Sequence, residues 1–156
     1  MHLRHVHKVD APAAEVIEAL RKGGLHVARA RRDQGCVGAR CIPREPHGFD
    51  VVTESYRRKP TGGLDRSQTE RAVQRFRWDK DGCTLRWTWS GPGDDRVQLS
   101  GLLRVLGEAS GSQVESEVDI TVDIPLVHRM IEGLVAREMS AAEATFVEDL
   151  LRFVRS

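Results

Sequence analysis

Hydrophobic residues in the last thirty positions recur every three or four residues. The stripe comprises Val127, Met130, Ile131, Leu134, Val135, Met139, Ala142, Phe146, Leu150 and Phe153. This spacing places apolar side chains on one face of a helix. Pro125 suits the first turn, where a missing N–H removes no helical hydrogen bond, and no later proline interrupts the stripe. The pattern predicts one helix over residues 126–153, about 40 Å long at 1.5 Å per residue.

Upstream of this stripe the hydrophobic period is two. Alternation at residues 36–44, 49–58, 67–79, 84–90, 97–105 and 114–122 predicts six strands. Glycine, proline and Asp-Gly breakers separate them at residues 45–48, 60–63, 80–82, 91–95 and 107–112. Short turns of this kind join antiparallel neighbours. Gly101 lies inside a predicted strand, where a bulge or bend would let the sheet curl.

The N-terminal segment predicts a strand followed by two short helices. Residues 2–9 alternate, with Leu3, His5, His7 and Val9 on one face. Asp10 supplies a capping acceptor and Pro12 a first-turn proline for a helix that ends at residues 23–24. A second helix is predicted over residues 25–32, with its three arginines in water. The fold class is therefore α+β: a curved, six- to seven-stranded antiparallel sheet packed on the long helix.

Composition adds few constraints to this picture. The 156 residues, 40% hydrophobic and 30% charged, suit one soluble domain over residues 1–156. No apolar run is long enough for stable membrane insertion, and the N-terminus lacks the apolar region of a signal peptide, so the expected location is the cytoplasm. Cys36, Cys41 and Cys83 form no CxxC pair, which predicts reduced thiols and no structural zinc site.

The two halves of the chain differ in charge. Residues 1–80 carry 17 Lys/Arg against 10 Asp/Glu, whereas residues 81–156 carry 7 against 13. A fold that pairs N-terminal with C-terminal strands is expected to bring the two signs together. No nucleic-acid-binding motif accompanies the basic half, so nucleic acid is not an expected partner.

Aromatic and aliphatic residues of the middle strands are the first candidates for ligand contact. Two indoles on one face can stack on a flat ligand and also orient it through their N–H groups. Plain core packing explains the same pattern equally well. This group comprises Leu85, Trp87, Trp89, Phe76 and Trp78, to which Met130 and Leu134 of the long helix are added.

Four polar residues are further candidates. His5 and His7 share a face with Leu3, so on a concave face they would enter an apolar environment, but the expected position is at the surface or rim near the N-terminus. Two histidines do not complete a zinc site, and we predict no metal and no cofactor. Glu138 falls within the apolar arc of the long helix, where it would act as acid or base, hold a ligand, or lie solvated at a pocket mouth. Tyr56, the only tyrosine, offers a hydroxyl anchor.

Two segments carry a resemblance to a known superfamily. They read VDAPAAEV at residues 9–16 and VDIPLVHRMIE at residues 122–132. With this order of elements, the chain resembles the START and polyketide-cyclase-like superfamily of helix-grip domains, and within it an uncharacterised bacterial family. Its relatives carry glycine where this chain has His128. The resemblance implies a hydrophobic cavity between sheet and long helix, and it transfers no catalytic residue.

Three functions follow as alternatives. The first is binding of a small hydrophobic ligand, such as a lipid, sterol or polyketide-like molecule, without chemistry. The second is an enzyme of the cyclase, dehydratase or isomerase kind that uses the same cavity. The third is an interaction or chaperone-like module whose cavity is closed by side chains. The sequence specifies neither the ligand nor an oligomeric state.

Overall fold

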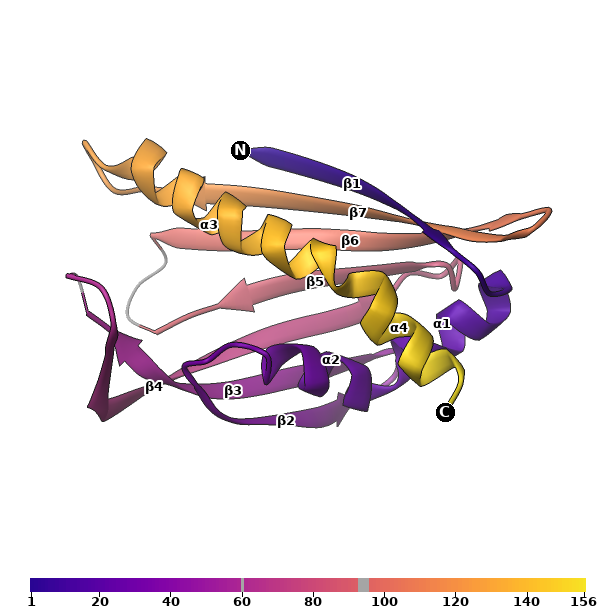
Figure 1. Ribbon diagram of the computed structural model, residues 1–156, viewed down its shortest axis with the longest axis horizontal. Helices are drawn as coiled ribbons and strands as arrows, with labels where there is room; N and C mark the ends of the chain where they lie inside the picture. Colours follow the sequence, from indigo (N-terminus) through magenta and orange to yellow (C-terminus); the bar gives the residue numbers. More distant parts are fainter. Residues whose placement is uncertain (60, 93–95) are drawn as a thin grey trace.

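The computed structural model describes residues 1–59, 61–92 and 96–156. It contains seven strands and four helices in the described part of the chain (Figure 1). In chain order they are β1 (His2–Val9), α1 (Ala13–Arg21), α2 (Gly23–Ala30), β2 (Cys36–Arg44), β3 (Gly48–Arg58), β4 (Leu64–Trp78), β5 (Thr84–Ser90), β6 (Val97–Glu108), β7 (Gly111–Val122), α3 (His128–Ala144) and α4 (Phe146–Val154). Parts of the predicted turns at residues 60–63 and 91–95 lie outside the described residues.

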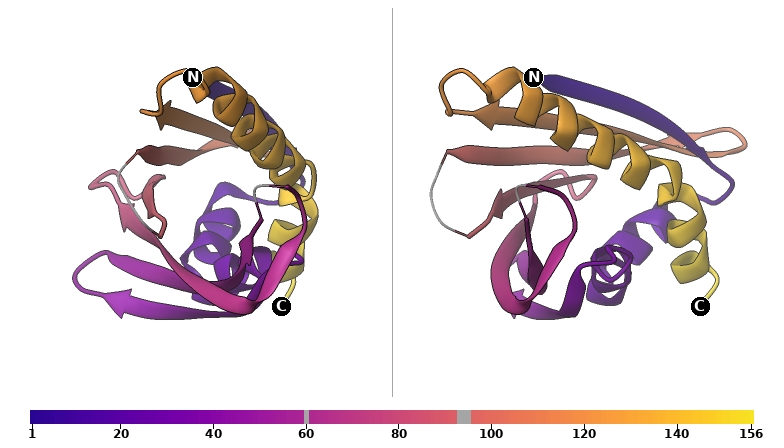
Figure 2. Two further views of the ribbon diagram at one scale, coloured as in Figure 1. Left: turned by 90° about the vertical axis from the view of Figure 1, so that its left-hand side faces the viewer. Right: turned by 60° about the vertical axis from the view of Figure 1, so that its left-hand side comes forward.

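The strands form one antiparallel sheet in the order β1-β7-β6-β5-β4-β3-β2. Figure 2 shows that the sheet curves and that the helices lie on its concave side. Consecutive strands from β2 to β7 are neighbours, as short turns require, and β1 closes the β7 edge. The predicted α+β class, with a curved antiparallel sheet packed on C-terminal helices, is confirmed.

Side chains fill the concave side where α1, α2 and α4 pack. Val16, Leu20 and Leu25 of the short helices and Leu150 of α4 are completely buried there. The sheet contributes Leu85, also completely buried, to the same core. The three helices and the sheet therefore share one continuous core.

The C-terminal helix differs from its prediction in continuity. It begins at His128 rather than residue 126 and is interrupted at Thr145, where φ is −103° and ψ is −1°. Pro125 lies in the turn before the helix, and Leu126 has a positive φ of 71°. The single unbroken helix predicted over residues 126–153 is therefore wrong in detail. The two pieces follow one another on the same side of the sheet as one long bent helix (Figure 1).

Three local expectations also need correction. Asp10 does not cap α1, whose N-cap is Pro12 and receives no side-chain hydrogen bond. Gly23 begins α2 instead of ending α1, and Lys22 separates the two helices. Register runs unbroken through Gly101, so this glycine forms no bulge. It makes room for Trp87 instead, because an added Cβ would lie 2.6 Å from the indole Cζ2 atom.

Two chain-wide expectations can be compared with the structure. Cys36, Cys41 and Cys83 are all free thiols, as predicted. Among the described residues, none of the helices is both long enough and apolar enough to span a membrane.

Candidate functional site

The concave face is unevenly covered along its length. α3 has no buried residue, although Ile131, Val135 and Met139 touch the core. Met130 is 62% exposed and Leu134 is 49% exposed. We call the region where α3 crosses the sheet the α3 end. The apolar side chains of α3 are only partly covered there, whereas Val118 and Ile120 of β7, the strand on which α3 packs, are buried.

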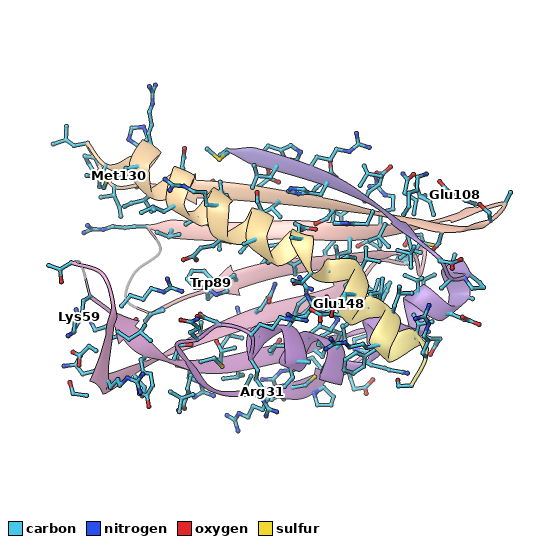
Figure 3. All side chains as sticks on the ribbon, in the orientation of Figure 1. Arg31, Lys59, Trp89, Glu108, Met130 and Glu148 are labelled. Atoms are coloured by element: carbon cyan, nitrogen blue, oxygen red, sulfur yellow. The ribbon has the colours of Figure 1, made fainter. Side chains whose placement is uncertain are left out.

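The predicted aromatic residues divide between the filled core and the α3 end. Phe76, Leu85 and Trp87 are buried in the core. Trp78 is partly buried and lies beneath the Arg21 guanidinium, 5.4 Å from the ring centroid. Trp89, near the end of β5, is only partly buried and stands over Gly91 (Figure 3). Of these five residues, Trp78 and Trp89 are the two that are only partly buried.

A polar cluster lies on the inner wall where β1 and β7 meet α3. His7 Nε2 lies 2.5 Å from Oε2 of Glu143, and the Ser116 hydroxyl donates to Oε1 of the same carboxylate at 2.7 Å. His7 and Glu143 are 13% and 14% exposed, and Ser116 is buried. Strand alternation turns His7 of β1 and Ser116 of β7 inward. Glu143 lies above them, just before the helix bends after Ala144.

Hydrogen bonds decide the charge of the Glu143 carboxyl. Desolvation, the largest single influence, raises its pKa, but the hydrogen bonds from His7 and Ser116 and the charges of both inward histidines lower it by more. The net result is a lowered pKa, so Glu143 is a carboxylate at neutral pH. A carboxylate accepts, so the His7 Nε2 atom carries the hydrogen of their shared bond.

His5 occupies the same inner wall as His7, whereas the sequence favoured a surface or rim position for both residues. The two imidazole rings are stacked, with centroids 6.4 Å apart and planes 13° from parallel. The Nδ1 atom of His5 is buried and has no hydrogen-bond partner among the described residues. His5 therefore contributes an unused polar atom beside a satisfied His7–Glu143–Ser116 cluster.

Glu138 and Tyr56 do not lie at this site. Glu138 is exposed and pairs with Arg58 of β3 at 2.9 Å, which matches the solvated alternative for this residue. Tyr56 alternates with the inward residues of β3 and so lies on the outer face, beneath the Arg66 guanidinium. The position of Tyr56 lends no support to its expected role as a hydroxyl anchor, because the strand parity that turns Phe49 inward turns Tyr56 outward.

Sequence reasoning missed Glu143 as the inward carboxylate and Arg29 and Asp149 as a buried ion pair. Arg29, expected in water, donates to Asp149 at 3.0 Å and to the Ala142 carbonyl at 3.0 Å, and Arg32 adds a second bond to Asp149. Glu143 stands between Met139 and Phe146 in the helical stripe, which is the signal that could have found it. No comparable signal marked the arginines, because helix pairing decides their environment.

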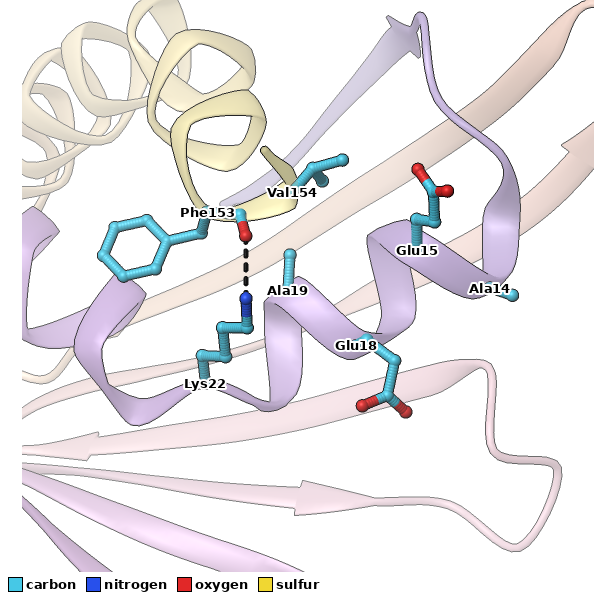
Figure 4. Close-up of a pocket in the computed structure, with 7 residues that line it drawn as sticks. All are labelled: Ala14, Glu15, Glu18, Ala19, Lys22, Phe153 and Val154. Atoms are coloured by element: carbon cyan, nitrogen blue, oxygen red, sulfur yellow. Dashed lines mark hydrogen bonds between the residues drawn. The ribbon is translucent and has the colours of Figure 1, made fainter. Parts of the chain in front are cut away.

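The two best-formed surface hollows of the described structure lie outside the space between α3 and the sheet. One, of about 230 Å³, lies between α1 and the end of α4, where Lys22 donates to the Phe153 carbonyl (Figure 4). The other, of about 260 Å³, lies at the β5–β6 end beside Trp89. Within residues 1–59, 61–92 and 96–156, no group of three or more His, Cys, Asp or Glu side chains is placed to hold a metal ion.

Solved structures share this fold at low sequence identity. An aromatase/cyclase, Zhui from Streptomyces sp. R1128, superimposes with a TM-score of 0.65 at 16% identity, over 99% of this chain and 93% of that one. A START superfamily protein from Mycobacterium smegmatis gives 0.63 at 10% identity, over 97% of each chain. Norcoclaurine synthase from Thalictrum flavum gives 0.66 at 16% identity, over 97% and 86%. The expected superfamily resemblance is confirmed at the level of fold.

Sequence comparisons narrow the assignment further. The search of curated proteins finds no match. A family model described as "Protein of unknown function (DUF2505)" matches residues 4–151, almost the entire chain. The chain belongs to this uncharacterised DUF2505 family, within the helix-grip fold shared by START proteins and polyketide aromatase/cyclases.

Proposed function

We propose that this protein binds a small apolar or amphipathic ligand at the α3 end, between α3 and the concave face. The observation that carries the proposal is the uneven coverage of that face. α1, α2 and α4 each bury apolar residues in the core, whereas α3 buries none and leaves Met130 and Leu134 about half exposed. A helix with an apolar stripe normally covers it. An apolar ligand would complete this packing.

Burial of apolar surface would contribute enough free energy for such a ligand to bind. Apolar surface removed from water contributes about 25 cal/mol per Å², so covering roughly 300 Å² would contribute about 7 kcal/mol before association and ordering losses. This permits micromolar affinity. Further support comes from the fold, because an aromatase/cyclase and a START superfamily protein share it. Their ligands are not transferred to this chain.

A fluorescence titration tests the proposal. Fatty acids, sterols and flat polycyclic compounds are added to the purified protein while tryptophan emission is followed. We expect at least one class to change the emission with saturation, and Trp89→Phe to remove most of the change, since Trp89 is the partly covered tryptophan on β5. No response across the panel would instead favour the interaction-module alternative, for which the exposed residues of α3 would form the contact.

A pair of variants tests whether the ligand binds against α3. Leu134→Glu puts a charge on the exposed part of the α3 stripe and should weaken binding at least about tenfold, because the charge must be desolvated. Val37→Glu is the matched control, since Val37 is 52% exposed and lies on β2. Equal losses in both variants would move the ligand away from α3.

An enzyme is the second candidate, favoured by the His7–Glu143 pair. The Nε2–H group of His7 donates a hydrogen bond to Glu143, which leaves Nδ1 as the ring nitrogen that Glu143 does not engage. A carboxylate that orients a histidine in this way suits general acid–base catalysis, in which a proton is moved on a bound substrate. His7→Gln should abolish such turnover while leaving ligand affinity within a few fold.

A further inference from the structure

A buried nitrogen without a partner marks the inner wall of the proposed ligand site. Nδ1 of His5 is shielded from water and makes no hydrogen bond to any described residue. An unsatisfied buried polar atom costs about 1–3 kcal/mol, and most such atoms in folded proteins are paired. The nearby polar groups do not relieve this cost, because His7, Ser116 and Glu143 are bonded to one another.

The position of His5 connects this nitrogen with the α3 end. His5 pairs with Ser116 across β1 and β7, and its neighbours on the inward face of β1 are Leu3 and His7. The His5 ring stacks with the His7 ring, and His7 is bonded to Glu143 of α3, so α3 passes over this part of the sheet. α3, which covers this wall, has no buried residue and packs on the core only through partly buried side chains.

The chemistry of the nitrogen selects the ligand group. Nδ1 accepts in one tautomer of neutral histidine and donates in the other. A hydroxyl serves both, because it donates and accepts, whereas a carbonyl or an ether oxygen serves only the donating tautomer. A carboxylate ligand would meet the negative charge of Glu143, which the lowered pKa of that group keeps ionised.

We propose that His5 is a specificity-determining residue whose Nδ1 atom binds the hydroxyl group of a neutral ligand with an otherwise apolar skeleton. The proposal rests on the proposed function and narrows its ligand class to apolar alcohols and phenols. His5 is a binding residue in this account and has no catalytic role.

A matched pair of probes tests the hydroxyl preference. Isothermal titration calorimetry compares 2-naphthol with 2-methoxynaphthalene, which share one apolar skeleton and differ in the hydroxyl hydrogen. We expect the wild-type protein to bind 2-naphthol about tenfold or more tightly than the methyl ether, the ratio that an unpaired buried group would produce. 2-Naphthoate, an anion of similar shape, should bind more weakly than 2-naphthol.

Two variants assign the preference to His5. His5→Phe keeps a flat ring and removes the nitrogen, so the affinity ratio should fall to about twofold or less while the ether still binds. His2→Phe is the control, because His2 lies on the same strand but faces outward and is bonded to Asp119. Circular dichroism and thermal unfolding establish that both variants are folded.

The outcomes separate this inference from the function on which it rests. If wild-type protein binds both probes equally, or His5→Phe keeps the wild-type ratio, the role of His5 is overturned and ligand binding at the α3 end stands. If neither probe nor any member of the fluorescence panel binds, the proposed function fails and the hydroxyl preference fails with it.

Discussion

His26 is a titratable side chain enclosed by apolar rings. It lies 5.0 Å from the Phe49 ring and 4.5 Å from the Phe76 ring, measured between centroids, and bonds the Leu20 carbonyl at 2.8 Å. Burial lowers the pKa of His26 from 6.5 to about 4, assisted by the charge of Arg29 and opposed by the bond to Leu20. The imidazole is therefore neutral in the folded protein at neutral pH, and its Nε2 atom donates to the carbonyl.

This lowered pKa predicts acid sensitivity. The unfolded chain takes up the proton near pH 6.5 and the folded protein near pH 4, so the stability is complete above pH 6.5 and lost as pH falls towards 4. Between pH 7 and pH 4.5 the loss from this group should be about 2–3 kcal/mol. Urea unfolding at both pH values measures it, and His26→Phe should show a correspondingly smaller pH difference. Parallel pH profiles for the two proteins would contradict the prediction.

Asp149 holds two arginines at the end of the molecule opposite the α3 end. It is only 4% exposed and bonds Arg29 and Arg32, while Arg29 also stacks on Phe146 with 5.1 Å between the guanidinium carbon and the ring centroid. Asp149→Asn would leave the largely buried Arg29 without its counter-charge. We expect a loss of about 3 kcal/mol in the free energy of unfolding.

Glu148→Gln is the neighbouring control for Asp149→Asn. Glu148 pairs with Arg152 at 2.6 Å, but both side chains are more than half exposed. Exposed pairs of this kind contribute about 0.3–0.5 kcal/mol, so chemical denaturation should barely distinguish this variant from wild type. Equal losses at positions 148 and 149 would show that burial does not set the strength of the Asp149 pairs.

At the scale of elements, the strands were more predictable than the helices. β2 and β5 occupy the predicted residues because alternation and turn residues are local signals. The ends of α1, α2 and α3 depend on the backbone conformation of single residues. Lys22 is extended between α1 and α2, and Leu126 has a positive φ before α3. These conformations follow from packing. The periodic stripe continues through Thr145, so the break there left no mark in the hydrophobic pattern.

The candidate site was predictable only in part for a related reason. Strand parity put His5 and His7 on one face, since a period of two leaves a strand residue only two directions, but it did not reveal that this face is the concave one. Helical phase is less strict, and an unbroken helix placed Glu138 inward instead of Glu143. The ion pairs of Asp149 join segments more than a hundred residues apart, which no local pattern reports.

Two strand glycines should respond oppositely to alanine. A Cβ at Gly101 would lie 2.4 Å from the Glu117 carbonyl oxygen and 2.6 Å from the Trp87 indole. Gly101→Ala should therefore cost about 1–3 kcal/mol in unfolding free energy through overpacking. Gly38→Ala, with no neighbouring atom within 4 Å, should be neutral or slightly stabilising because it restricts the unfolded chain. Thermal unfolding of both variants decides between packing and backbone freedom as the role of Gly101.

At the scale of the whole molecule, sheet order separates the charges of the two halves. β1 brings Arg4 and His2 to acidic residues of β7, as expected for N-terminal with C-terminal pairing. β2, β3 and β4 lie at the other end of the sheet. Arg75 and Arg77 of β4 alternate with buried Phe76, so they are exposed on the outer face. The expected neutralisation therefore operates at the β1 edge and not across β4.

Ion-exchange chromatography should detect this separation. At pH 7.8, the isoelectric point calculated from the sequence, we expect retention on a cation exchanger at low salt in spite of near-zero net charge. Arg75→Glu with Arg77→Glu should elute at lower salt than Arg129→Glu with Arg137→Glu, an equal charge change on exposed positions of α3. Identical elution of the two double variants would indicate that only net charge matters.

The bend at Thr145 divides one helix into two units of unequal local stability. α4 buries Phe146, Asp149 and Leu150, whereas α3 buries no side chain. Opening α3 exposes little additional apolar surface, so its amide hydrogens should exchange with deuterium much faster than those of α4. Mass spectrometry of peptides on either side of residue 145 measures the difference, and similar rates would contradict it. An occupied α3 end would then be recognised by slower exchange in α3 alone, before the ligand itself is identified.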